Sequence, residues 1–250
     1  MCIFTGPVSR VSKTRIFGRV DGTVQYVVYE MNLDTSVDVA MVLPVPVARR
    51  SGADAMRFVN LSRYKSFFEE IDQLFPKLVA PMSDSWSFSR ESTKLRVQTV
   101  GAYDASYIPN VEAFSRLDER FRLSAMVWNA FPHYADYGFA VFQLRQGAGR
   151  FHPMAFAFST RDPSQTFFPT MHVHDSKVHA TAKFDHVLYA QTANKPDTDW
   201  ITSKSVAGQI PGLRTWWGHD RSKGIISEEA PMNRLRIVGL HKNADVWVAS

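Results

Sequence analysis

The chain has very little cysteine, because Cys2 is the only one in 250 residues. A single cysteine excludes an internal disulfide and a zinc cage built from several cysteines. The sequence also lacks an apolar run long enough to span a bilayer, and no charged segment leads into an apolar stretch at its start. These absences predict a soluble, cytoplasmic protein with no membrane partner.

Several functional motifs are missing as well. The sequence contains no glycine-rich phosphate loop and no GxSxG nucleophile turn. The formal net charge is +5, but lysine and arginine are scattered singly or in pairs such as Arg49 and Arg50. Because nucleic-acid binding needs a basic stripe or patch, the sequence indicates no nucleic-acid partner.

What the sequence does contain is a pattern of short strands. Apolar residues make up 45% of the chain, enough to bury a sizeable core. Residues 23–47 predict two strands, the second apolar on both faces. Residues 62–75 and 110–123 have the apolar spacing of helices. We therefore expect one α+β domain over residues 1–250, mainly antiparallel β-sheet in a sandwich or partial barrel, with two or so helices.

Half of the eight histidines are concentrated in one stretch of the second half of the chain. His172 and His174 are two residues apart, so in a β-strand their side chains leave the same face. If residues 175–176 form a two-residue hairpin turn, His179 lies opposite His172 and joins that face. The pattern predicts a metal site with these three histidines as ligands, and it also resembles the first metal-binding motif of the cupin family.

Three neutral imidazoles suit a divalent transition metal such as zinc, iron or copper, and they leave coordination positions open, as in a catalytic site. Asp185 follows the same strand face, and His219 stands next to an aspartate in a loop with two tryptophans, so either is a candidate for moving protons. The hypothesis is a metal-dependent enzyme or metal-binding protein of unknown reaction. It is compatible with a small-molecule substrate.

Two alternatives stay open at this point. If Met1 is removed, Cys2 becomes an amino-terminal nucleophile with its own amine as base, which predicts an amidohydrolase. Otherwise the hairpin is an ordinary solvated surface, and the chain is a non-catalytic β-rich binding protein that contacts a partner through Trp216 and Trp217.

Several short motifs recur in an order that resembles a family of bacterial proteins known only as a domain of unknown function. They are the MC start, VLPVPV at residues 42–47 and VGAYD at residues 100–104. The resemblance covers roughly the first 160 residues. It implies a single domain and brings no activity or catalytic residue with it.

Overall fold

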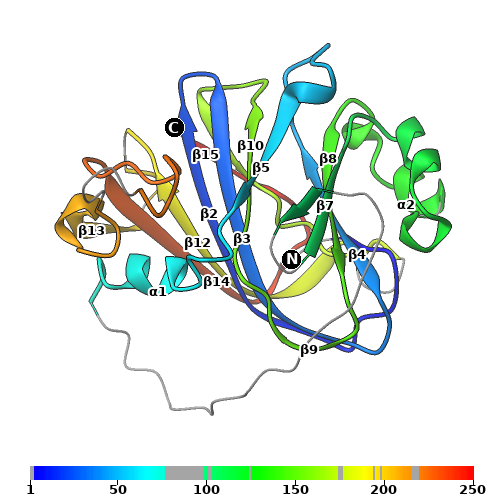
Figure 1. Cartoon of the computed structure of the whole chain (residues 1–250), viewed down its shortest axis with the longest axis horizontal. Helices are drawn as coiled ribbons and strands as arrows, with labels where there is room; N and C mark the ends of the chain where they lie inside the picture. The colour runs from blue at the N-terminus through cyan, green and yellow to red at the C-terminus, as the bar shows by residue number, and fades with distance from the viewer. Residues whose placement is uncertain are drawn as a thin grey trace.

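The computed structural model describes residues 3–76, 98–100, 103–123, 125–173, 177–193, 195–197, 199–214 and 220–250. Most of these residues lie in two larger β-sheets and a two-stranded sheet (Figure 1). The five-stranded sheet contains, in spatial order, β1 (Ile3–Phe4), β4 (Val39–Val45), β8 (Gly138–Leu144), β7 (Tyr103–Ile108) and β6 (Gln98–Val100).

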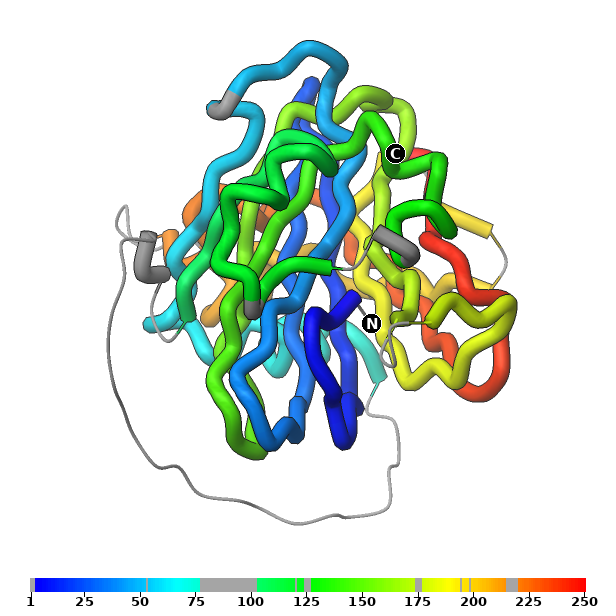
Figure 2. Tube along the Cα trace, turned by 90° about the vertical axis from the view of Figure 1, so that its right-hand side faces the viewer, coloured from blue at the N-terminus to red at the C-terminus, as the bar shows by residue number. Residues whose placement is uncertain are grey.

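The eight-stranded sheet contains the longest strands of the molecule. Its spatial order is β13 (Ile201–Val206), β14 (Pro231–Lys242), β12 (Thr181–Gln191), β2 (Arg10–Asp21), β3 (Val24–Thr35), β10 (Met154–Ser159) and β5 (Met56–Asn60), with β9 (Gly147–Arg150) beside the end of β3. The two-stranded sheet pairs β11 (Gln165–Phe168) with β15 (Val246–Ala249), and Figure 2 shows this C-terminal segment in red along one side of the molecule.

Among the described strands, β12 and β2 run parallel and the other neighbouring strands of the three sheets are antiparallel. Two α-helices occur among the described residues, α1 (Phe67–Asp72) and α2 (Ala125–Asn129). The prediction of a mainly antiparallel, β-rich α+β fold is therefore confirmed. No helix among the described residues combines the length and the apolar character that crossing a bilayer requires.

The strand β4 shows why the two larger sheets lie against each other. All seven of its residues are buried. Because side chains alternate along a strand, one set points to each face. Val39, Met41 and Leu43 join a cluster that also holds residues of the eight-stranded sheet, such as Tyr29 and Phe156. Ala40 and Val42 join a second cluster under the helical segments. The predicted two-sided burial of this strand is thus confirmed.

The helical segments cover the outer faces of the sheets. The apolar stripe predicted over residues 62–75 is buried against β2, β3 and β12, although the α-helix itself spans only Phe67–Asp72. Residues 110–123 form 3₁₀ turns, η2 (Glu112–Arg116) and η3 (Glu119–Phe121), in place of the predicted α-helix. Asn110 still caps the segment, because its Oδ1 accepts from the Ala113 N–H at 2.9 Å. Three further 3₁₀ turns are η1 (Ala53–Ala55), η4 (Pro132–Tyr134) and η5 (Ala207–Gln209).

Candidate functional site

Among the described residues, the strand pairing predicted for the histidine hairpin does not form. Val173 makes an isolated parallel bridge with Ile3, not a pair with Val178. The next strand, β12, begins only at Thr181 and pairs with β14 and β2. His172 is 6% exposed whereas His179 is exposed, so the two side chains do not share a face. His174 lies outside the described residues.

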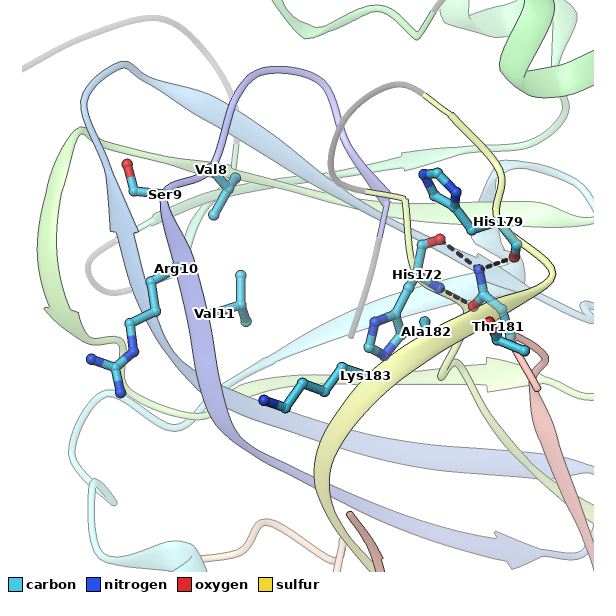
Figure 3. A pocket seen from close by; sticks show the side chains of 10 residues that line it. Val8, Ser9, Arg10, Val11, His172, His179, Thr181, Ala182 and Lys183 are labelled. Carbon is cyan, nitrogen blue, oxygen red and sulfur yellow. Dashed lines mark hydrogen bonds between the residues drawn. The ribbon is translucent and has the colours of Figure 1, made fainter. Parts of the chain in front are cut away.

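Asn243 holds the backbone of the two described histidines in place. Its Nδ2 donates to the carbonyl oxygens of His172 (2.9 Å) and His179 (3.0 Å), and its Oδ1 accepts from the His172 N–H at 2.8 Å. Figure 3 shows these bonds as dashed lines. The side-chain amide therefore forms hydrogen bonds to the backbone that the predicted pairing of two strands would have formed.

The His172 ring packs on the inner side of β12. Its centroid lies 4.3 Å from that of Phe184 and 5.2 Å from that of His186. His186 is completely buried. His172 is thus part of a packed aromatic group in the core, and sequence alternation alone gave no sign of this contact.

Asp185, the predicted proton carrier, has a structural partner. Its Oδ2 accepts a hydrogen bond from the Lys13 backbone N–H at 2.9 Å. Lys13 has a φ of 52°, and the register between β2 and β3 shifts between Ser12 and Arg15. A carboxylate that binds the backbone N–H at such a bulge stabilises the irregular strand geometry.

The other residues proposed for chemistry cannot be placed. Cys2 and His219 lie outside the described residues, and so do Trp216 and Trp217 of the proposed contact loop. The amidohydrolase alternative therefore stays a prediction, and so does the role assigned to the tryptophan loop.

A cleft of about 470 Å³ opens next to the histidine segment (Figure 3). One wall consists of residues at and just before the start of β2, from Val8 to Val11. The other wall is the start of β12, from Thr181 to Lys183, with His172, His179 and Asn243 beside it. Among the described lining residues none is acidic, while Arg10 and Lys183 carry positive charge. The volume lies in the usual range of ligand-binding clefts.

A network of charged side chains around the buried Glu30, on the outer face of the eight-stranded sheet, was not foreseen from the sequence. The Glu30 side chain is 2% exposed and accepts from Arg15 and from Arg150, whose Nη2 lies 2.6 Å from Glu30 Oε2. Glu69 of α1 contacts the same two arginines. Burial acts against the charge of Arg15, but Glu30 and Glu69 outweigh it and raise the pKa of the guanidinium. These contacts bind α1 to the sheet.

A second polar group is buried where β15 begins. The Asp245 carboxylate accepts from the Tyr134 hydroxyl at 2.5 Å and from the N–H groups of Thr170 (2.8 Å) and Met171 (3.0 Å). Burial raises the pKa of Asp245, although these donors oppose the shift. The carboxylate joins η4 to the strand region before the histidine segment.

Comparisons with known proteins locate the fold. No family model matches the chain, and no curated protein does, so the resemblance to a family of unknown function stays a prediction. A crystal structure of baculovirus P35 matches 100% of this chain and 99% of its own, with a TM-score of 0.50 at 16% identity. A structure of the caspase-8/P35 complex matches 96% of both chains, with a TM-score of 0.45 at 14% identity. The chain therefore has a P35-like fold.

These findings correct the functional hypothesis. Among the described residues, no group of three or more histidine, cysteine, aspartate or glutamate side chains could hold a metal ion. The fold resembles that of P35 along the whole chain. The interpretation as a metal-dependent enzyme or metal-binding protein with a three-histidine site on a β-hairpin is therefore wrong. A small-molecule substrate gains no support from either structure.

Proposed function

We propose that the chain is a non-catalytic, β-rich protein that acts by binding another protein. The observation that carries this proposal is the likeness to P35 along the full length of both chains. A protein that shares only a domain with a binding protein can have another role, but here no part of the described fold is added or missing on the scale of a domain.

The described residues are consistent with a binding role. The carboxylates of Glu30 and Asp245 both accept hydrogen bonds from donors within the protein. Such paired carboxylates stabilise a rigid scaffold, whereas a catalytic group is aimed at a place that a substrate can reach. We keep the cytoplasmic location and the packing of the two larger sheets as a sandwich as parts of this proposal.

The first partner to test is caspase-8, because it is the protein bound to P35 in the caspase-8/P35 complex. The purified chain and purified caspase-8 are mixed at micromolar concentration and analysed by size-exclusion chromatography with light scattering. The proposal expects a complex whose mass is the sum of both proteins. An unrelated protein of similar size and charge in place of caspase-8 is the control. Separate elution at tens of micromolar would reject caspase-8 as the partner.

A further inference from the structure

The cleft lies where the neighbouring parallel strands β2 and β12 diverge. β12 pairs with β2 from His186 onward, opposite Thr14. Before that point β2 pairs only with β3, and residues 181–185 of β12 pair only with β14, as far as the described strands show. The Lys13 N–H bond to Asp185 marks the fork. Among the strands that the structure describes, neither edge has a partner at this point, and both edges border the same space.

A strand needs partners on both sides to use all its backbone groups. Its N–H and C=O groups point alternately to the two sides, so a strand with one neighbour offers the other half for pairing. Extended peptides commonly bind proteins by adding a strand to such an edge. In Figure 3, Lys183 extends across the space toward β2, and Val8 and Val11 lie on the opposite wall.

The charge of the cleft selects the kind of peptide. Arg10 and Lys183 are exposed and lie on opposite walls, and the described lining contains no acidic side chain. Charge complementarity raises association rates and rejects partners of like charge. Apolar contacts are available from Val8, Val11 and Ala182. An extended segment that alternates acidic and small apolar residues fits these features.

We infer that the cleft between β2 and β12 binds an extended, acidic peptide segment of a partner protein as an inserted β-strand. The inference rests on the proposed function, since it assigns protein binding to one place on the fold. Binding of this kind depends on hydrogen bonds of the peptide backbone and on the negative charge of the peptide side chains. These two requirements can be tested separately.

The probe is a fluorescent octapeptide of alternating glutamate and valine, titrated into the whole protein and followed by polarisation. Two control peptides have the same length: one has lysine in place of glutamate, and one carries N-methyl groups on alternate amides. Only the unmodified acidic peptide should bind. Equal binding of the N-methylated peptide would reject strand insertion, and equal binding of the lysine peptide would reject the role of charge.

Substitutions in the protein test whether the peptide binds in the cleft. Lys183→Glu and Arg10→Glu should each weaken binding roughly tenfold, because attraction becomes repulsion. Lys204→Glu is the matched control, since Lys204 is exposed on β13, which pairs with the other end of β14, and it should leave binding unchanged. Hydrogen exchange of residues 9–12 and 181–185 should slow when the peptide is bound. Unchanged exchange there would overturn the inference.

The outcomes separate this inference from the proposed function. If caspase-8 forms a complex but the acidic peptide does not bind, the cleft inference is wrong and the binding role stands. If the peptide binds and caspase-8 does not, the cleft stands and the choice of partner is wrong. Failure of the acidic peptide to bind at millimolar concentration rejects the cleft inference in either case.

Discussion

The Asn243 side chain and the His172 backbone form a reciprocal pair of hydrogen bonds, in which the amide accepts from the His172 N–H and donates to the His172 carbonyl. A third bond runs from Asn243 to the His179 carbonyl. This arrangement imitates a rung of a β-ladder without a second strand. It sets the position of the segment that borders the cleft, and so links the fold to the candidate site.

We expect Asn243→Asp to destabilise the protein by roughly 2–4 kcal/mol. The carboxylate keeps the bond from the His172 N–H, but it loses both donors and places a negative charge against the carbonyls of His172 and His179. Asn243 is only 8% exposed, so the lost bonds are not fully replaced by bonds to water. Urea unfolding measures the effect. Asn60→Asp is the control, because exposed Asn60 uses only its Oδ1, as acceptor for the Ser62 N–H.

Glu30 and Glu69 bind the same two arginines, but we expect substitution of the buried Glu30 to destabilise the protein more than substitution of Glu69. Glu30→Gln should cost about 3 kcal/mol, because it leaves Arg15 and Arg150 without their buried counter-charge. Glu69→Gln should cost less than about 1 kcal/mol, because the Glu69 side chain is 43% exposed and solvent screens its ion pairs. Equal losses in the urea unfolding of both variants would contradict the assigned role of burial.

The buried Asp245 predicts a specific dependence of stability on pH. Its folded pKa is raised above the ordinary value of 3.8 by burial. The folded state therefore holds this proton more tightly, so the associated stability is fully present below the unfolded pKa and is lost as the pH rises through the folded pKa. Asp245→Asn removes the titration. The unfolding free energy of the unmodified protein minus that of the variant should fall from pH 4 upward.

Asp162 provides a control of opposite sign. Hydrogen bonds from Ser164 and Gln165 lower the pKa of this exposed carboxylate. Its contribution is therefore present above the unfolded pKa and lost as the pH falls through the folded pKa. In the comparison with Asp162→Asn, the same difference should rise with pH. A slope of the same sign for both aspartates would show that the response comes from elsewhere in the molecule.

The sequence predicted those parts of the fold that depend on local pattern. The apolar run of β4 indicated burial on both faces, and the stripe in residues 62–75 indicated a core-facing segment. Asn110 indicated a cap. In each case the side chains that decide the structure lie within a few positions of one another. The α-helix expected over residues 110–123 became 3₁₀ turns, but the same apolar face is buried.

The candidate site could not be predicted because its partners are distant in sequence. Alternation in residues 171–184 fits a local hairpin as well as it fits a strand that pairs elsewhere, and only long-range contacts decide between them. Thr181 pairs with Lys242, and Asn243 holds His172 from 71 positions away. Likewise, Asp185 has the residue type of a proton carrier, but its position opposite the Lys13 bulge gives it a structural role.

Gly18 of β2 predicts a steric effect at the contact with β11. A Cβ at this position would lie 2.7 Å from Thr166 Cγ2 and 3.0 Å from atoms of the Phe168 ring. Both residues are completely buried and have little room to move. Gly18→Ala should therefore cost roughly 1–3 kcal/mol of unfolding free energy through overpacking. Gly149→Ala is the control, because a Cβ there meets nothing within 4 Å.

A second substitution tests whether this clash is the cause. Thr166→Ser removes the methyl group that meets the new Cβ and keeps the hydroxyl, which hydrogen-bonds to the Ser250 Oγ at 2.8 Å. In the Gly18→Ala background it should restore part of the lost stability, whereas alone it should cost about 1 kcal/mol for the lost methyl group. Additive losses in this double-mutant cycle would show that Gly18 is required for another reason than its closeness to Thr166.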